Sequence, residues 1–237
     1  MNIQLNADVG EGMLNDAQLM PFLTYANIAS GGHTGNENSI QQTVSLAQKY
    51  NVKVGAHPSY PDKDNFGRKS MQISLLNLEQ TISKQVDLFL KVVKNLNTSM
   101  YHVKLHGALY NDVFKEEKLT HWFLNFIAKK YEGTKVFVPV GAKDYVKPNY
   151  QHMIIYEVFA DRNYNDELQL VPRSYPNAVL EKPIEVLKHV QGLFLKNKLT
   201  SINGNRFKVK ADTFCLHGDN PNVIAIAEII NELKKSV

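Results

Sequence analysis

Cysteine is almost absent from the sequence. Cys215 is the only one among 237 residues, so the chain cannot form an internal disulfide, and a cysteine-rich zinc site is excluded. A metal site would therefore have to use histidine and carboxylate ligands. The absence of disulfides fits a reducing compartment, and we expect a cytoplasmic protein.

Long apolar runs and concentrated positive charge are lacking as well. No segment approaches the roughly 18 consecutive apolar residues of a membrane-spanning helix. The net charge is +4, from 27 basic and 23 acidic residues, and the lysines are scattered instead of forming the basic stripe typical of nucleic-acid binding. We therefore expect neither a membrane nor a nucleic acid as a partner.

The glycine-rich phosphate loop and the serine-hydrolase elbow are also missing. The sequence therefore shows neither a standard ATP-binding loop nor a serine hydrolase.

Short apolar segments alternate with longer amphipathic segments along the sequence, which is typical of an α/β fold. Strands are predicted at residues 3–8, 26–30, 52–57, 101–106, 135–140, 153–159 and 213–217. Helices are predicted at residues 38–50, 75–96, 115–131, 183–196 and 221–235. No low-complexity linker or repeat interrupts this order, so we predict one domain over residues 1–237.

Polar residues occupy every second position in several predicted strands. Asn6 and Asp8 share one face of the first strand, and His102, Lys104 and His106 share one face of the fourth. An open sheet covered by helices on both sides would bury these polar faces. In a closed parallel barrel the polar side chains point inward and converge at the carboxyl ends of the strands. The pattern therefore predicts a seven-stranded (β/α) barrel with a polar mouth.

Five of the eight histidines lie in or directly after these strands: His33, His57, His102, His106 and His217. Glycine or proline flanks most of them, so the strand ends and the backbone turns there, and we expect each histidine at the barrel mouth. Imidazole is suited to general acid or base catalysis, above all beside a carboxylate. The candidate carboxylates are Asp8, Glu11, Asp161 and Asp219. The alternative is that these histidines are structural, hydrogen-bonded groups.

Three cations accompany the histidines. Lys104 lies between two histidines on one strand face, and Arg162 and Arg173 are two of only four arginines. Each is suited to a phosphate, a carboxylate or a developing oxyanion, and each also fits a structural ion pair. Cys215, in mid-strand between apolar neighbours, is interpreted as a core residue instead of a nucleophile.

Seven motifs in order resemble the LamB/YcsF family over nearly the whole chain. They are Asn6-Ala7-Asp8-Val9-Gly10-Glu11, Asn27-Ile28-Ala29-Ser30-Gly31-Gly32-His33, Val54-Gly55-Ala56-His57-Pro58-Ser59-Tyr60-Pro61-Asp62 with Phe66-Gly67-Arg68 after it, His102-Val103-Lys104-Leu105-His106-Gly107-Ala108-Leu109-Tyr110, Glu157-Val158-Phe159-Ala160-Asp161-Arg162, Leu170-Val171-Pro172-Arg173 and His217-Gly218-Asp219. The resemblance implies a seven-stranded barrel of the glycoside hydrolase/deacetylase type.

The resemblance also implies one subunit of an ATP-dependent 5-oxoprolinase. Such an enzyme hydrolyses the lactam of 5-oxo-L-proline to L-glutamate, with ATP going to ADP and phosphate, together with subunits B and C. ATP and its Mg²⁺ are the implied cofactors. The expected catalytic residues are Asp8, Lys104, His106, Asp161 and His217. The expected substrate-binding residues are Asn6, Glu11, His33, His57, Arg162, Arg173 and Asp219.

Two other functions remain open from the residues. Asp8, His33 and His57 follow the first three strands and are of the types that bind a divalent ion, so the chain would also suit a metal-dependent deacetylase or amidohydrolase. A zinc-activated water would not need ATP. Alternatively, the polar mouth only holds a ligand, and the chain is a noncatalytic binding subunit.

Overall fold

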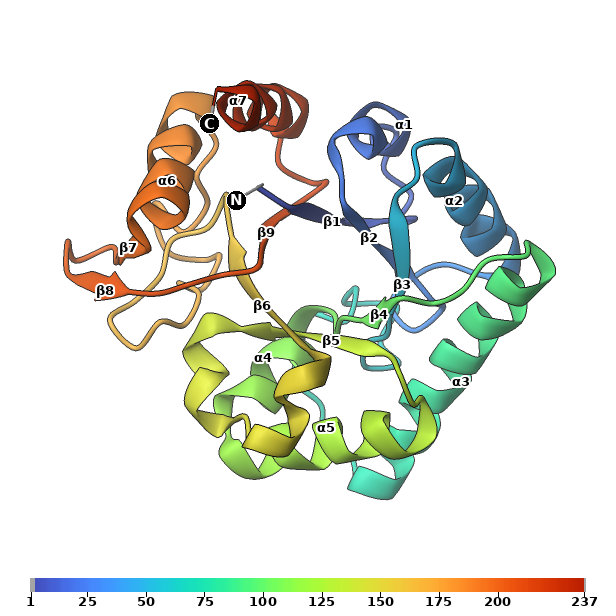
Figure 1. Cartoon of the computed structure of the whole chain (residues 1–237). Coiled ribbons are helices and arrows are strands. Elements are labelled where there is room, and N and C mark those ends of the chain that lie inside the picture. Colours follow the sequence, from blue (N-terminus) through green and yellow to red (C-terminus); the bar gives the residue numbers. More distant parts are fainter. Residues whose placement is uncertain (1–2, 237) are drawn as a thin grey trace.

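Seven parallel strands form a closed barrel, as predicted (Figure 1). The structure is a computed structural model and describes residues 3–236. The strands follow one another around the barrel in the order β1 (Leu5–Val9), β2 (Tyr25–Ala29), β3 (Lys53–His57), β4 (His102–Val103), β5 (Lys135–Pro139), β6 (Ile154–Phe159) and β9 (Thr213–Leu216).

The barrel closes because β1 pairs on both sides. Ala7 is in register with Ala26 of β2 and with Leu216 of β9. Closure leaves no unpaired strand edge within the barrel. It also brings the carboxyl ends of all seven strands to one rim, so that the loops after distant strands share a mouth.

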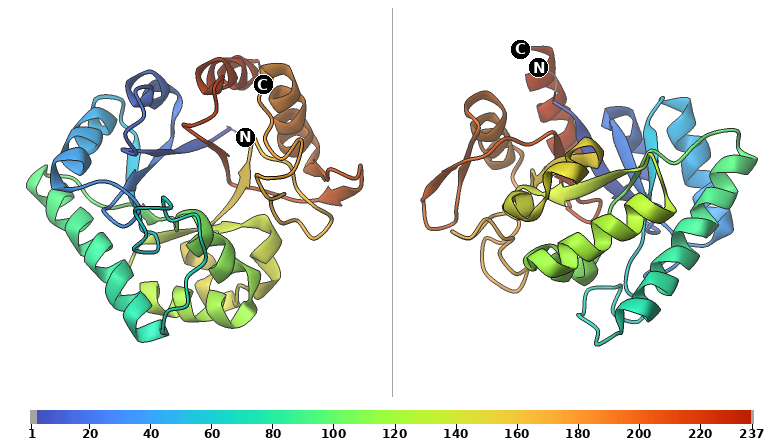
Figure 2. Two further views of the ribbon diagram at one scale, coloured as in Figure 1. Left: turned by 180° about the vertical axis from the view of Figure 1, so that it is seen from behind. Right: turned by 60° about the horizontal axis from the view of Figure 1, so that its bottom comes forward.

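Amphipathic helices form a ring outside the strands, and the view from behind shows the same ring (Figure 2). The five predicted helices are present as α2 (Glu37–Lys49), α3 (Leu75–Asn95), α5 (Glu117–Lys130), α6 (Pro183–Lys196) and α7 (Val223–Lys235). In α3 the buried residues Ile82, Val86, Phe89 and Val93 recur at helical spacing and face the strands. Over residues 3–236, no helix has both the length and the apolarity needed to cross a membrane.

The fourth predicted strand, residues 101–106, is much shorter in the structure. β4 ends at Val103, and the helix α4 (Gly107–Lys115), which was not predicted, begins directly after His106. Gly107 has a φ of +57°, and a Cβ atom there would lie 2.5 Å from the carbonyl oxygen of Gly67. Only glycine fits this turn. Because glycine is a poor helix former, the sequence pattern did not indicate a helix start.

Several short elements were also missed. They are α1 (Asp16–Leu19), the 3₁₀ segments η1 (Met20–Phe22), η2 (Val140–Tyr145) and η3 (Pro148–Met153), and an antiparallel hairpin of β7 (Lys198–Thr200) and β8 (Arg206–Lys208). The hairpin lies outside the barrel beside α6 (Figure 1).

The polar faces of the strands point into the barrel, as predicted. Asn6 donates to Thr213 across the β1–β9 junction at 3.0 Å, and Asn27 donates to Asn6 at 2.8 Å. His102 contacts Asn27 at 2.7 Å, although their strands are not neighbours. All of these side chains are buried, and hydrogen bonding between them offsets the cost of removing polar groups from water. This hydrogen-bonded layer fills the barrel interior below the residues of the mouth.

Candidate functional site

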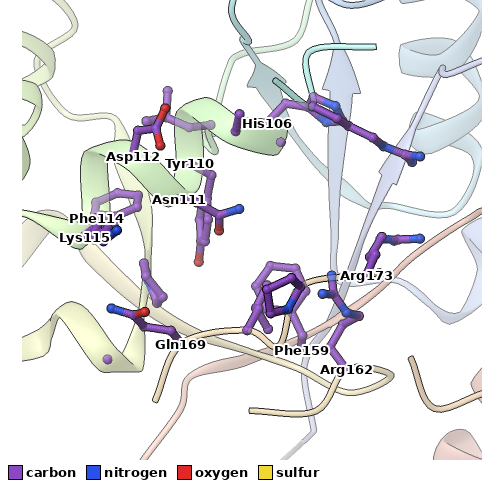
Figure 3. A pocket seen from close by; sticks show the side chains of 18 of the residues that line it. His106, Tyr110, Asn111, Asp112, Phe114, Lys115, Phe159, Arg162, Gln169 and Arg173 are labelled. Atoms are coloured by element: carbon purple, nitrogen blue, oxygen red, sulfur yellow. The ribbon is translucent and has the colours of Figure 1, made fainter. Parts of the chain in front are cut away.

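A cavity of about 690 Å³ opens at the carboxyl ends of the strands (Figure 3). Side chains from the loops after β1, β4, β6 and β9 line it, so the mouth predicted from the strand alternation exists. The predicted site residues on its wall are Asp8, Glu11, Lys104, His106, Arg162, Arg173, His217 and Asp219. Four other predicted residues, Asn6, His33, His57 and Asp161, lie behind this wall and contact the residues that form it.

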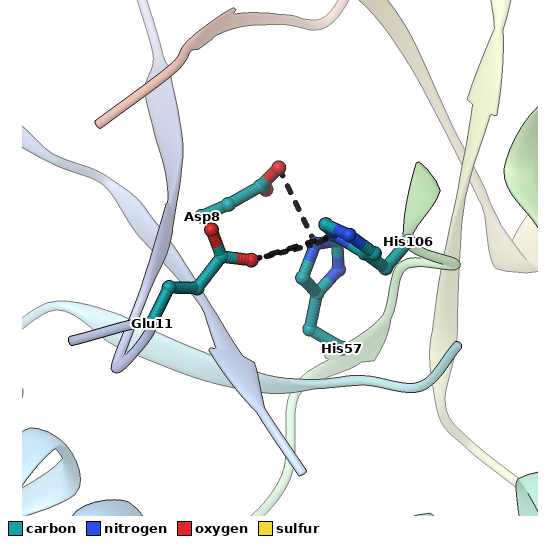
Figure 4. Close-up of side chains that lie close together, drawn as sticks. All are labelled: Asp8, Glu11, His57 and His106. Atoms are coloured by element: carbon teal, nitrogen blue, oxygen red, sulfur yellow. Dashed lines mark hydrogen bonds and ion pairs between the residues drawn. The ribbon is translucent and has the colours of Figure 1, made fainter. Parts of the chain in front are cut away.

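Two carboxylates and two imidazoles meet on one side of the mouth (Figure 4). His57 Nε2 lies 3.0 Å from His106 Nδ1, 3.3 Å from Asp8 Oδ2 and 3.9 Å from Glu11 Oε1. His106 Nδ1 lies 3.4 Å from Glu11 Oε1. One donor atom from each residue lies within 4.8 Å of all the others, which makes the group able to hold a metal ion. We refer to Asp8, Glu11, His57 and His106 as the four-residue cluster.

Backbone carbonyls fix the orientation of both imidazole rings in the cluster. His57 Nδ1 contacts the carbonyl oxygen of Lys104 at 2.8 Å, and His106 Nε2 contacts that of Phe66 at 3.0 Å. Since a carbonyl oxygen only accepts, each of these ring nitrogens carries a proton and donates it. The other nitrogen of each ring therefore faces into the cluster.

Burial and mutual repulsion govern the charges of the cluster. Burial and the nearby His57 lower the pKa of His106 to about 3, so this ring is neutral at physiological pH. Burial and Asp8 raise the pKa of Glu11. Burial also acts to raise the pKa of Asp8, but His57 and Lys104 outweigh it and hold that pKa well below its ordinary value. Asp8 is therefore ionised at neutral pH.

His33 lies outside the four-residue cluster, although the sequence pattern indicated Asp8, His33 and His57 as possible metal ligands. Its Nε2 lies 2.9 Å from Glu11 Oε1, and its ring stacks on that of His106 with centroids 3.7 Å apart. His33 therefore contacts two members of the cluster without belonging to it. The cluster contains Glu11 and His106 in addition to Asp8 and His57. Burial and His57 lower the pKa of His33 to about 3.

Lys104 connects two carboxylates inside the barrel. Its ammonium lies 2.9 Å from Asp8 Oδ1 and 3.1 Å from Glu157 Oε2, and the side chain is almost fully buried. Tyr110 donates to the other oxygen of Glu157. Burial lowers the pKa of Lys104, but Asp8 and Glu157 outweigh it, so the amine stays charged. The structural ion pair is therefore present, and because the ammonium also borders the cavity its catalytic role stays a prediction.

Cys215 is buried in the core, as expected, although it has a charged neighbour that the sequence did not reveal. Its Sγ lies 3.0 Å from the ammonium of Lys104. Burial nevertheless raises the pKa of the thiol well above its ordinary value. The thiol therefore remains protonated and is a poor nucleophile.

Asp161, after β6, and His217, after the neighbouring strand β9, form a second acid–base pair at the mouth. Asp161 Oδ1 contacts His217 Nδ1 at 2.8 Å, and its other oxygen accepts from the backbone N–H of His217 and from Asn220. Burial opposes ionisation, but His217 and Asn220 hold the pKa of Asp161 below its ordinary value. An ionised aspartate on Nδ1 leaves Nε2 of His217 as the basic nitrogen, in the arrangement of a general base with its orienting carboxylate.

Arginines occupy the outer rim. Asp219 accepts from Arg68 at 2.9 Å and from both terminal nitrogens of Arg173 at 3.0 and 3.2 Å. Burial acts to raise the pKa of Asp219, but Arg173, His217 and Arg68 lower it. Arg162, also on the cavity wall, is anchored by donating to the carbonyl oxygens of Ala178 and Val171.

One predicted histidine is not at the mouth. His102 lies deeper in the barrel, where it contacts Asn27 and stacks on Phe137 with centroids 4.3 Å apart. Burial lowers its pKa well below the ordinary value, so it is a neutral core histidine. The expectation that all five strand histidines reach the mouth is therefore wrong for His102. It lies two residues before Lys104, and the chain runs on to His106 before it turns into α4.

The sequence reasoning missed three residues of the site: Glu157, Tyr110 and Arg68. Glu157 had a signal, because a carboxylate in mid-strand on an inward face needs a buried partner. Tyr110 lies on α4, the helix that the pattern did not indicate. Arg68 is in a loop whose path depends on tertiary contacts, so nothing in its local sequence placed it beside Asp219.

Known proteins resemble this chain in sequence over nearly its whole length. The family described as LamB/YcsF matches residues 3–236. A relative from Haemophilus influenzae (strain PittEE), named as the A subunit of 5-oxoprolinase, is 36% identical over 236 residues, which cover 99% of this chain and 96% of the relative. A relative of the same name from Thermococcus sibiricus is 36% identical over 239 residues, covering 98% and 93%.

A solved structure agrees with these sequence matches. The "lactam utilization protein" from Thermus thermophilus superposes on this chain with a TM-score of 0.88 and 29% sequence identity, over 98% of this chain and 97% of the other. The family match spans the first and last strands of the barrel and includes every residue of the four-residue cluster. The chain therefore belongs to the LamB/YcsF family.

Proposed function

We propose that this chain is the A subunit of an ATP-dependent 5-oxoprolinase. The enzyme would hydrolyse the lactam of 5-oxo-L-proline to L-glutamate, with ATP going to ADP and phosphate, and would need subunits B and C. The observation that carries the proposal is the mouth itself, where acid–base groups and guanidinium groups border one cavity. Near-full-length relatives that bear this name support the choice of substrate. In this proposal the single barrel domain spans residues 1–237.

The reaction explains why both kinds of group are needed. A lactam carbonyl is a poor electrophile, so ATP first phosphorylates its oxygen. Water then attacks the activated carbon and gives up a proton, and the ring C–N bond breaks as its electron pair goes to the nitrogen, which is protonated. A second water releases phosphate from the resulting carboxyl phosphate. The site must therefore orient water, move protons and neutralise phosphate charge.

The inner side of the mouth suits the water and its proton. The four-residue cluster offers oriented acceptors to position the water, and His217 can take the proton because Asp161 holds its Nδ1. The ammonium of Lys104 keeps Asp8 ionised and in place. Oriented acid–base groups of this kind contribute roughly 10²- to 10⁴-fold to a rate.

The outer side suits the negative charges of the substrates. Arg173 and Arg68 lie on the rim, and the guanidinium group is planar and matches a carboxylate with two parallel hydrogen bonds. We assign Arg173 to the substrate carboxylate or to a phosphate oxygen, with Asp219 holding it in position until the anion arrives. The cavity is larger than 5-oxoproline alone would fill, which leaves room for the transferred phosphoryl group.

Arg173→Lys tests this assignment. Lysine keeps the charge but loses the two-pronged geometry, so we expect the KM for 5-oxoproline to rise about 10-fold or more, since a hydrogen bond to a charged group is worth about 1.5–3 kcal/mol. The kcat should change less. Arg206→Lys, on the exposed strand β8, is the control. An unchanged KM for both 5-oxoproline and ATP would remove Arg173 from substrate binding.

Reconstitution tests the proposal as a whole. The sequence lacks a recognisable phosphate loop, so we expect the purified chain alone to be nearly inactive and to turn over 5-oxoproline only with ATP and both partner subunits. The measurement is 5-oxoproline-dependent release of phosphate and glutamate. Robust ATP-dependent turnover by the chain alone would contradict the need for partners.

Two other outcomes would identify the alternatives. Turnover of a lactam or an N-acetyl substrate without any nucleotide would favour the metal-dependent amidohydrolase, which needs only an activated water. Substitutions in the mouth that change substrate affinity but never turnover would favour a noncatalytic binding subunit.

A further inference from the structure

The two imidazoles of the four-residue cluster each turn a nitrogen toward the other, and neither of these nitrogens is the one that donates to a backbone carbonyl. His57 donates through Nδ1 and His106 donates through Nε2, each to a carbonyl oxygen. With both rings neutral, the remaining nitrogens, His57 Nε2 and His106 Nδ1, are both acceptors, yet they lie 3.0 Å apart. Two lone pairs at this distance need a positive centre between them, which is either a proton on one ring or a metal ion.

The carboxylates add two more acceptors to the same point. Lys104 and Asn27 both donate to Asp8 Oδ1, which leaves Oδ2 to face His57 at 3.3 Å. Glu11 Oε1 faces His106 at 3.4 Å. In a tetrahedral zinc site with bonds of about 2.0 to 2.1 Å, neighbouring donor atoms lie about 3.3 Å apart. The contacts of 3.0, 3.3, 3.4 and 3.9 Å in the cluster scatter around this spacing.

The carboxylates in and around the four-residue cluster also favour a bound cation. Lys104 pairs with both Asp8 and Glu157, and Glu11 adds a third carboxylate beside Asp8. A buried excess of negative charge is costly unless it is paired or binds a metal. A dication bound among these donors would balance this excess.

We propose that Asp8 Oδ2, Glu11 Oε1, His57 Nε2 and His106 Nδ1 bind one transition-metal dication of the zinc type. Two imidazoles and two carboxylates favour zinc, cobalt or manganese over magnesium, which prefers oxygen ligands and keeps its waters. The carbonyl oxygens of Lys104 and Phe66 hold the ligand rings in the required tautomers. A bound ion would act as a Lewis acid at the mouth. The proposal does not rest on the assigned reaction, because it concerns only the geometry of these donors.

Direct metal binding by the full chain tests the site. The chain is stripped with a chelator and titrated with Zn²⁺ by calorimetry, and its Co²⁺ form is examined by visible absorption. We expect one equivalent of Zn²⁺, intense absorption bands typical of four-coordinate cobalt, and a melting temperature that rises with Zn²⁺, because an ion that binds only the folded chain stabilises it. These readouts need no substrate, nucleotide or partner subunit, so failure of the 5-oxoprolinase assay would leave them intact.

Two matched substitutions each remove or weaken one ligand. His57→Asn keeps an N–H group in place to donate to the Lys104 carbonyl but removes Nε2, and Glu11→Gln removes one charge at nearly constant shape. We expect each to weaken Zn²⁺ binding by at least about 10- to 100-fold, which is the loss seen when even a residue that only orients a ligand is removed. His152→Asn is the control, since His152 is exposed at the end of η3, before β6 begins.

The outcomes decide between an ion and a proton. Stoichiometric binding that both variants lose supports the site, and if one variant does not fold, the other still provides the comparison. No Zn²⁺ binding by the wild-type chain at micromolar concentrations, or undiminished binding by Glu11→Gln and His57→Asn, would overturn the proposal and leave a shared proton between the rings. Equal affinity for Mg²⁺ would overturn the assignment to a metal of the zinc type.

Discussion

His106→Ala is expected to lower turnover of the reconstituted complex by roughly 10²- to 10⁴-fold. His106 is the imidazole that both borders the cavity and joins the four-residue cluster. Its Nδ1 is held between His57 and Glu11, so its loss removes an oriented acceptor at the point where the water is to be positioned. The measurement is the rate of 5-oxoproline-dependent phosphate release.

His106→Gln separates catalytic from structural use of this residue. The glutamine amide can still donate to the carbonyl oxygen of Phe66, as Nε2 does, but it offers no acceptor at the position of Nδ1. We expect this variant to melt close to the wild-type temperature and to be nearly as inactive as His106→Ala. Near-normal turnover in His106→Gln, with loss only in His106→Ala, would show that His106 is a structural residue.

The structure changes the expected cost in stability. From the sequence, His106 is expected to be a rim imidazole with few contacts, but only 6% of its surface is exposed, and it stacks on His33. His106→Ala therefore loses packing as well as hydrogen bonds, and we expect it to lower the free energy of unfolding by about 1–3 kcal/mol. Both losses are small enough for the chain to remain folded.

Lys104→Met is expected to destabilise the chain by roughly 3–5 kcal/mol. The substitution keeps much of the side-chain volume but removes the only ammonium between Asp8 and Glu157, so two buried carboxylates lose their partner. The measurement is the free energy of unfolding from urea denaturation at neutral pH. Lys91→Met is the control, because Lys91 pairs with Glu37 on the surface, where an ion pair contributes about 0–1 kcal/mol.

The pH at which the chain unfolds in acid gives a second test of Lys104→Met. The folded-state pKa of Asp8 is held below its ordinary value by His57 and Lys104 against burial. Its ionisation therefore stabilises the folded chain above a pH of about 4 and ceases to do so as the pH falls through the folded-state pKa. Without Lys104 the pKa of Asp8 should rise, so Lys104→Met should unfold at a higher pH than the wild type.

A double substitution shows whether unpaired charge is the cause. If Glu157 is destabilised by losing Lys104, then Lys104→Met combined with Glu157→Gln should recover part of the lost stability, because the two residues are in contact and their effects do not add. Stability of Lys104→Met within about 1 kcal/mol of the wild type would contradict a structural ion pair and leave Lys104 free for a purely catalytic role.

The sequence by itself determined the barrel and the chemical types at its mouth. Alternation along β1 placed Asn6 and Asp8 on the inward face, because successive side chains of a strand point to opposite sides. The helical spacing of residues such as Val86 and Phe89 identified the outer layer in the same way. Both patterns are local and repeat within a few residues, so they can be recognised without knowing which residues come into contact in the fold.

Tertiary structure alone decided which of these residues meet. His106 approaches His57 across 49 positions of sequence, and the loop that carries Phe66 reaches the His106 ring only because Gly67 and Gly107 allow their backbones to touch. The same folded arrangement places His33 against Glu11 and His102 in the core. Period and residue type give the direction of a side chain, whereas its height in the barrel and its contacts depend on register and loop path, which are fixed only when the strands close into a ring.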